Sequence, residues 1–194
     1  VLVNGTQRGT VTVNGFGNWS LTLPTLLDGT YAITARATDA VGNASGLSSP
    51  YMITIDRVAP AAPVITGVTD NAELITGTVP NGGRTNDPTP TISGTAEAGS
   101  TVTVLLNEVA QAMTATADSG GRWSLTTTAQ ADGAYTITAR ASDAAGNTGV
   151  SSAAYTITID LTPPAAPVIT GVVDNMPLGT GTVPSGGRSN DSTP

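Results

Sequence analysis

The sequence predicts an all-β protein made of tandem antiparallel β-sandwich repeats, and three observations carry this prediction. First, 47 of the 74 positions from Gly17 to Pro90 are identical to the positions 104 residues later, with no gap. Second, apolar and polar residues alternate in short runs that turn residues separate every 8 to 12 residues or so. Third, the composition favours strands and tight turns, with 23 Gly and 13 Pro in 194 residues. A unit of about 104 residues is long enough for one sandwich.

The repeat also predicts the domain boundaries. The motif PAAPVIT begins at Pro60 and again at Pro164, and each copy follows a YMITID or YTITID segment. We therefore expect one complete repeat over residues 57–160. Residues 1–56 are expected to be the C-terminal part of a preceding repeat, and residues 161–194 the N-terminal part of the following one. This arrangement predicts that the chain is a piece of a much longer protein.

Within the complete repeat, the alternation predicts seven strands, all paired antiparallel, and no helix. Their side chains should point inward at alternate positions, as at Tyr135 and Ile137 in one strand and at Ile157 in the last. The same rule places Ala139, Ala141, Tyr155 and Ile159 inward. The predicted strands are 63–68, 89–96, 101–107, 112–118, 122–127, 134–143 and 154–160.

Three blocks of sequence resemble a known family. They are TNDPTPTISGTAEAGSTVTV, ADGAYTITARASDAAGN, and YTITID followed shortly by PPAAPVITGV. Together they resemble the bacterial immunoglobulin-like (Ig-like) tandem repeats of giant surface adhesins and biofilm-associated proteins, and the likeness covers all 194 residues. The resemblance implies an Ig-like sandwich, an extracellular or cell-surface role in adhesion or biofilm formation, and calcium that rigidifies the junctions between repeats.

Charge and hydropathy exclude two classes of partner. The net charge is −7, and the seven basic residues, all Arg, are spread along the chain. Such a chain cannot displace counterions from nucleic-acid phosphates, so we expect no nucleic-acid binding. No run of 18 apolar residues is present, so we expect no insertion into a membrane.

The residue types present argue against an enzyme. The chain has no His, Cys or Lys, which excludes a Ser-His-Asp triad, a thiolate nucleophile, a His-ligated zinc and a Schiff base. Carboxylate chemistry remains, and Asp118-Ser119-Gly120 matches the aspartic-protease triplet. That triplet lies between two predicted strands, and the preceding repeat has Asn14 in its place. We therefore interpret it as a hairpin turn, and we predict no catalytic residues.

Trp19 and Trp123 occupy equivalent positions, each after a Gly-rich turn. A single Trp in each sandwich is more often part of the core or the cover of a hairpin than a platform that stacks on a sugar. We therefore expect core packing and keep carbohydrate stacking as the alternative.

Asp, Asn and Glu residues near the strand ends predict metal sites. The loops of a sandwich lie at two poles. One group of these residues is expected at the N-terminal pole, where the linker arrives, and a second group at the C-terminal pole. In a tandem array the two poles face each other, so oxygen donors should converge at each junction, as Ca²⁺ requires. The alternative is that these side chains only cap turns. The N-terminal group is Asp56, Glu97, Asp143 and Asn147; the C-terminal group is Asp70, Asp87 and Asp160.

These expectations combine into a structural function. We expect a non-catalytic spacer of a bacterial surface or secreted protein, stiffened by interdomain Ca²⁺ and by the prolines of its linkers. Its partners would be neighbouring repeats, while other regions bind a host or abiotic surface, a glycan or a matrix. Two alternatives stay open. The repeat itself could bind a glycan or protein or associate laterally with its copies, or it could be an accessory domain of a secreted polysaccharide hydrolase.

Overall fold

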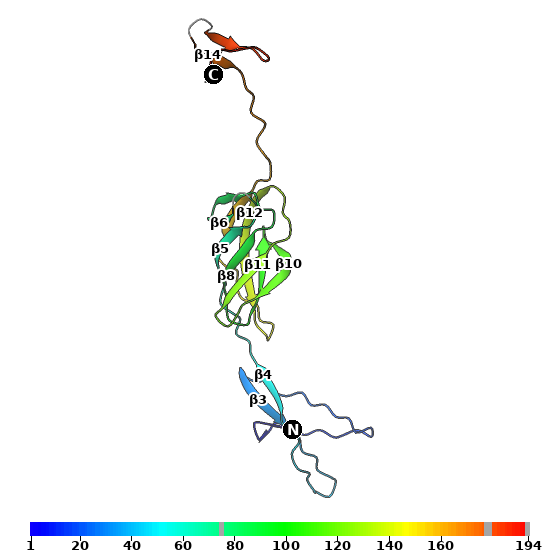
Figure 1. The fold of residues 1–194 in the computed structure, drawn as a ribbon. Helices are drawn as coiled ribbons and strands as arrows, with labels where there is room; N and C mark the ends of the chain where they lie inside the picture. Colours follow the sequence, from blue (N-terminus) through cyan, green and yellow to red (C-terminus); the bar gives the residue numbers. More distant parts are fainter. Residues whose placement is uncertain (74–75, 177–179, 193–194) are drawn as a thin grey trace. The chain divides into compact units, whose positions relative to one another are not determined.

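The computed structural model describes residues 1–73, 76–176 and 180–192. These residues form strands and loops, with no helix among them, so none of the described segments is a membrane-spanning helix (Figure 1). The chain divides into two compact units, Val1–Leu161 and Thr162–Pro194. An all-β fold is therefore confirmed.

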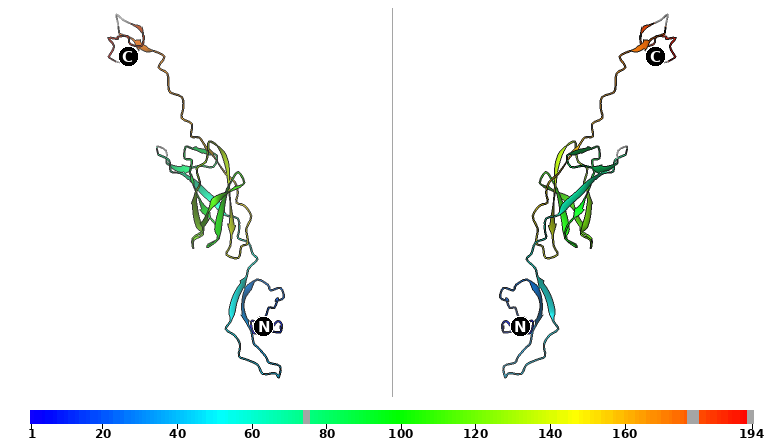
Figure 2. Two further views of the ribbon diagram at one scale, coloured as in Figure 1. Left: turned by 90° about the vertical axis from the view of Figure 1, so that its right-hand side faces the viewer. Right: turned by 90° about the vertical axis from the view of Figure 1, so that its left-hand side faces the viewer.

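The central part of the first unit is a sandwich of two sheets, visible edge-on in Figure 2. One sheet has the order β10-β9-β12-β13-β7, and the other has the order β11-β8-β5-β6. The strands are β5 (Val64–Asp70), β6 (Gly77–Val79), β7 (Gly83–Thr85), β8 (Thr91–Thr95), β9 (Thr101–Leu106), β10 (Val109–Thr116), β11 (Arg122–Thr126), β12 (Gly133–Ser142) and β13 (Tyr155–Ile159).

The connection between β5 and β8 differs from the prediction in two ways. It contains β6 and β7, which the prediction of seven strands missed, because three residues are too few to show an alternating pattern. In addition, β7 pairs parallel to β13, with Ile157 opposite Gly83 and Ile159 opposite Thr85. The expectation of purely antiparallel pairing was therefore wrong here. The chain crosses from the sheet of β5 to that of β13 in this connection, and β7 covers the edge of β13.

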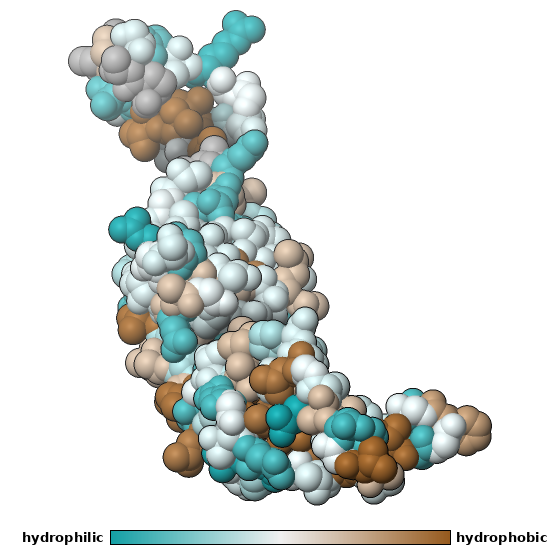
Figure 3. All heavy atoms as spheres, turned by 90° about the horizontal axis from the view of Figure 1, so that it is seen from below, coloured by the Kyte–Doolittle hydropathy of each residue, from teal (hydrophilic) through white to brown (hydrophobic). Residues whose placement is uncertain are grey.

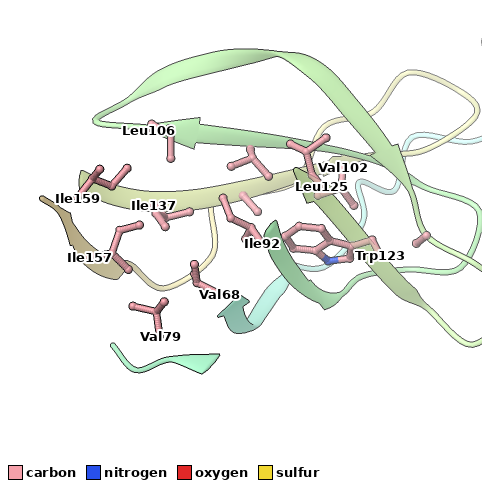
Figure 4. Packing of buried hydrophobic residues seen from close by; sticks show 13 residues of the cluster. Val68, Val79, Ile92, Val102, Leu106, Trp123, Leu125, Ile137, Ile157 and Ile159 are labelled. Carbon is pink, nitrogen blue, oxygen red and sulfur yellow. The ribbon is translucent and has the colours of Figure 1, made fainter. Parts of the chain in front are cut away.

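The core lies between the two sheets, as Figure 4 shows. The predicted alternation along β12 and β13 is confirmed, since Ile137, Ile157 and Ile159 are at most 3% exposed. Ala139 and Ala141 are also buried, whereas the two tyrosines are partly buried. The indole of Trp123 is 4% exposed, which confirms its core position. It covers Gly94, where an added Cβ would lie 2.6 Å from the ring and 2.1 Å from the Val64 carbonyl oxygen.

Residues 1–56 form a smaller sheet with the order β2-β1-β3-β4. Its long pair repeats the register of β12 and β13, since Gly29 lies opposite Ile55 as Gly133 lies opposite Ile159. The segment that contains Trp19 has no strand, and this indole is 48% exposed. Other large apolar side chains of these residues are exposed too, and Figure 3 shows apolar groups interspersed on the surface. The strands are β1 (Leu2–Val3), β2 (Thr6–Gln7), β3 (Gly29–Thr34) and β4 (Tyr51–Ile55).

The second unit contains the hairpin of β14 (Val172–Asp174) and β15 (Gly181–Val183). Asp174 pairs with Gly181 as Asp70 pairs with Gly77 in β5 and β6. Matching segments of the repeat therefore form the same strand pairing in both units.

Candidate functional site

The loop after β12, residues 143–147, is closed by the side chain of Asp143. One carboxylate oxygen, Oδ1, accepts hydrogen bonds from the backbone N–H groups of Ala145 and Asn147, both at 2.9 Å. The other, Oδ2, accepts a hydrogen bond from Asn147 Nδ2 at 2.8 Å. This is the Asx turn that the sequence offered as the alternative to metal binding. The carboxylate therefore organises the loop with protein donors alone.

The corresponding loop of residues 39–43 has the same structure. Asp39 Oδ1 accepts from the N–H groups of Val41 at 3.0 Å and Asn43 at 2.8 Å, and Oδ2 accepts from Asn43 Nδ2 at 2.8 Å. The two loops, 39–43 and 143–147, therefore have the same pattern of hydrogen bonds. Both copies of the DAxGN motif thus form the same loop.

These hydrogen bonds lower the pKa of both aspartates. For Asp143 the largest cause is the hydrogen bond from the Asn147 side chain, and for Asp39 it is the one from Asn43. A donor to the ionised form favours that form. Because the pKa is depressed in the folded state, the loop's contribution to stability is present above the ordinary pKa of Asp and is lost as pH falls through the lowered value.

The variant Asn147→Ala is expected to raise the pKa of Asp143 toward the ordinary value for Asp, because the main donor to its Oδ2 is removed. An NMR titration of the Asp143 carboxyl carbon measures this shift, with Asp39 of the same chain as the internal reference. A pKa of Asp143 unchanged by the substitution would show that the side-chain amide is not what lowers it.

The N-terminal group of predicted ligands is gathered around one hollow. A cavity of about 390 Å³ is lined by three of the four, Asp56, Glu97 and Asp143, and by Thr54, Ala98, Gly99, Ser100, Ala144 and Ala145. The fourth, Asn147, donates a hydrogen bond from Nδ2 to the carbonyl oxygen of Asp56 at 3.0 Å. The topology therefore brings these loops and the end of β4 together, although they are far apart in the sequence.

The side chains in this hollow are not arranged as a ligand set. In the described part of the chain, no three His, Cys, Asp or Glu side chains stand close enough to hold a metal ion. Asp56 Oδ1 accepts from the N–H of Val58 at 3.0 Å, and the Glu97 carbonyl accepts from Ser100 N at 3.0 Å and Oγ at 2.6 Å. Among the described residues no hydrogen bond reaches the carboxylate of Glu97, which is exposed.

The C-terminal group is arranged differently, because two of its aspartates are buried. Asp70 is 4% exposed and Asp87 is 2% exposed. Asp70 accepts from the Ala72 N–H at 2.9 Å and from Thr85 Oγ1 at 2.6 Å. Asp87 accepts from the Asn71 N–H at 2.8 Å, and from Thr89 N and Oγ1 at 2.7 and 3.1 Å. All four carboxylate oxygens are thus engaged by protein donors.

Thr85 links this pair to the third predicted ligand, Asp160. The backbone N–H of Asp160 donates to the Thr85 carbonyl at 2.9 Å, and its carboxylate lies 3.6 Å from Arg84 in an exposed ion pair. In the second unit, Asp174 accepts from Ser189 Oγ at 2.9 Å, as Asp70 accepts from Thr85. The hydrogen bond between this aspartate and the hydroxyl residue 15 positions later therefore forms in both units from the matching local sequence.

Three residues, Arg57, Gly149 and Leu161, make contacts at the linkers that the sequence did not predict. Arg57 Nε donates to Asp28 at 2.8 Å, and Gly149 lies against the carbonyl oxygen of Pro60. At the other linker, Leu161 replaces Arg57, and its backbone N–H donates to Asp132 Oδ1 at 2.7 Å. The sequence signal was the change from Arg57 to Leu161, the first of three consecutive differences between two blocks that match on either side. The predicted turn at Asp118 is present, with Oδ1 accepting from the N–H groups of Gly120 and Arg122.

Comparison with known proteins gives the family. The family model of the bacterial Ig-like domain matches residues 1–57 and 62–161. Exoglucanase B of Cellulomonas fimi is 32% identical over 173 residues, which cover 84% of this chain and 14% of the exoglucanase. The solved BSP domain of a biofilm-associated protein is 26% identical, with a TM-score of 0.36, over 83% of this chain and 25% of that one. Because the family match covers well over half of the sequence, the chain belongs to the bacterial Ig-like domain family.

Proposed function

We propose that this chain is a non-catalytic spacer of a large bacterial surface or secreted protein, and that Ca²⁺ at the junction before the sandwich stiffens it. The observation that carries the calcium proposal is the hollow lined by Asp56, Glu97 and Asp143. The role in adhesion or biofilm formation, and the extracellular location, follow from the resemblance of the repeats to surface adhesins. The partners are the neighbouring repeats of the same protein.

The chemistry of the hollow fits a hard cation. Its charged side chains are all carboxylates, which are the preferred ligands of Ca²⁺. Glu97 is exposed and its carboxylate makes no hydrogen bond in the described structure, and Asp56 is exposed and uses only Oδ1, in its bond with the Val58 N–H. The oxygens of Asp143 keep lone pairs beyond those used in the loop. Three negative charges around one hollow repel each other unless a cation joins them. Binding therefore draws the end of β4 toward the two loops of the sandwich.

The C-terminal group supports calcium less well. Asp70 and Asp87 are buried and saturated with hydrogen bonds, so a cation there would have to displace protein donors. We propose that these two aspartates hold the connection between β5 and β8, and we place the calcium at the N-terminal group.

Calcium is expected to raise the thermal midpoint of the chain, by the equivalent of about 2.7 kcal/mol at a hundredfold excess over its dissociation constant, because it binds only the folded state. The variant Glu97→Gln should lose most of this increase and keep the midpoint found in chelator, since the Glu97 carboxylate makes no hydrogen bond in the described structure. Glu108→Gln, in the turn between β9 and β10, is the control. Equal midpoints in calcium and in chelator for the unmodified chain would contradict the calcium proposal.

A second candidate function keeps the spacer role but assigns the chain to a different kind of parent protein. The similarity to a segment of an exoglucanase favours an accessory domain of a secreted polysaccharide hydrolase. The reading frame around this sequence distinguishes the two candidates. A glycosidase domain beside the repeats favours the hydrolase, whereas a long array of further repeats favours the surface spacer.

A further inference from the structure

The linker from Asp56 to Pro60 makes contacts on both sides. We propose that it is held by a metal-independent clip, in which Asn147 and Gly149 receive the linker on the sandwich and Arg57 ties it to the residues before it. This inference rests on the proposed spacer function, because a clip that sets the position of the linker sets the angle between repeats. Hydrogen bonds and close packing then define the junction before any cation binds.

The first contact is made by the Asn147 side chain. Its Nδ2 donates to Asp143 Oδ2 at 2.8 Å and to the Asp56 carbonyl oxygen at 3.0 Å. The bond to Asp143 orients the amide, so that the second hydrogen points at the linker with little further loss of conformational entropy. Asp56 in turn accepts a hydrogen bond from the Val58 N–H at 3.0 Å, which restrains the linker backbone directly after this contact.

The second contact is the close approach of Gly149 to Pro60. A Cβ added at Gly149 would lie 2.2 Å from the Pro60 carbonyl oxygen, so only glycine permits this packing. The position of Gly149 is fixed by its N–H, which donates to the Ala141 carbonyl at 2.9 Å. Pro60 is buried in this contact.

The third contact holds the other side of the linker. Arg57 donates from Nε to Asp28 at 2.8 Å and from Nη2 to the Leu26 carbonyl at 3.2 Å. Both charged groups are largely exposed, so this arm positions the chain more than it stabilises it. The arm is specific to this linker, because Leu161 stands at the equivalent position. The receiving glycine is also specific, because the first repeat has Ser45 where the complete repeat has Gly149.

Backbone order of the linker tests the clip. ¹⁵N relaxation of the whole chain in excess EDTA should give order parameters near about 0.85 for the amides of Arg57, Val58 and Ala59. In Asn147→Ala and in Gly149→Ala they should fall below about 0.6. Gly149→Ala leaves the hydrogen bonds of the Asp143 loop in place, so its effect cannot come from a damaged loop.

Two control variants come from the first repeat. Asn43→Ala removes the same amide from the equivalent loop, and Gly46→Ala adds a methyl group where nothing lies within 4 Å. Neither should change the order of the linker. The amides of β12 report in every variant that the sandwich is folded.

Each outcome separates this proposal from the calcium proposal. Linker order lost in both variants, with no effect of calcium on the unmodified chain, supports the clip and contradicts the calcium site. A linker that is mobile in EDTA and ordered only by added Ca²⁺ overturns the clip and supports the calcium site. Order in EDTA that survives both substitutions also overturns the clip.

Discussion

Replacing Trp123 with alanine is expected to lower the free energy of unfolding of the sandwich by about 3 to 5 kcal/mol. The indole is 4% exposed, and Trp123 lies opposite Gly94 in the pairing of β11 with β8. Its Nε1 has no hydrogen-bond partner, so the substitution leaves no acceptor unsatisfied and the loss is one of packing. Urea denaturation followed by circular dichroism measures the change.

Trp19→Ala is the matched control for this prediction. The two tryptophans occupy equivalent positions of the repeat, but Trp19 is 48% exposed and lies outside any strand. Its replacement should cost less than about 1 kcal/mol. Similar losses for both variants would mean that Trp19 is packed as Trp123 is, contrary to the structure.

The sequence predicted the sandwich because its alternating pattern records burial directly. In β12 and β13 every second residue faces the core, so Ile137 and Ile157 could be assigned inward from the period alone. The strands β6 and β7 could not be found this way, since three residues contain little more than one period. Their pairing depends on which edge the chain passes, and that is decided by tertiary structure.

The repeat offset hid one correspondence. The backbone N–H of Asn107 donates to the Thr136 carbonyl oxygen, and Asn107 Oδ1 accepts from the Thr136 N–H. Asn4 makes the same two hydrogen bonds with Ala32. Asn4 and Asn107 are separated by 103 residues, one fewer than the main offset of the repeat, so the ungapped comparison of the two repeats missed their equivalence. A turn of fixed geometry was conserved where the alignment had shifted by one residue.

The candidate site was predicted in part. Sorting loops by pole placed Asp56, Glu97 and Asp143 at one end of the sandwich, and the three do line one hollow. The contact of Asn147 with Asp56 spans 91 residues and depends on where the linker docks, so no local pattern could indicate it. Asp87 was expected at the C-terminal junction, because the long connection in which it lies was placed at that pole. It is nevertheless 2% exposed, although its bonds with Thr85 and Thr89 are local: Asp191 N–H and Ser189 Oγ repeat the Asp87–Thr85 bond in the second unit.

Replacing Asp87 with alanine is expected to destabilise the sandwich by about 3 kcal/mol or more, since hydrogen bonds to a charged acceptor contribute about 1.5 to 3 kcal/mol each. Three donors, the Asn71 N–H and the Thr89 N–H and Oγ1, would lose their acceptor at a carboxylate that is 2% exposed. Thr89 and Asn71 flank the connection that carries β6 and β7. The loss should therefore be accompanied by faster hydrogen exchange in both short strands.

Asp118→Ala separates burial from hydrogen bonding as the cause. Asp118 also accepts two backbone N–H groups, at 2.8 and 2.9 Å, but it is exposed, so water can replace the lost acceptor. Its replacement should cost about 1 kcal/mol.

The calcium dependence of the stability lost in Asp87→Ala then decides the role of the Asp87 carboxylate. If its oxygens serve only protein donors, the loss is equal in calcium and in chelator. If the loss appears only in calcium, Asp87 is a metal ligand, as its place in the sequence suggested, and its hydrogen bonds to Asn71 and Thr89 contribute little to the stability of the sandwich.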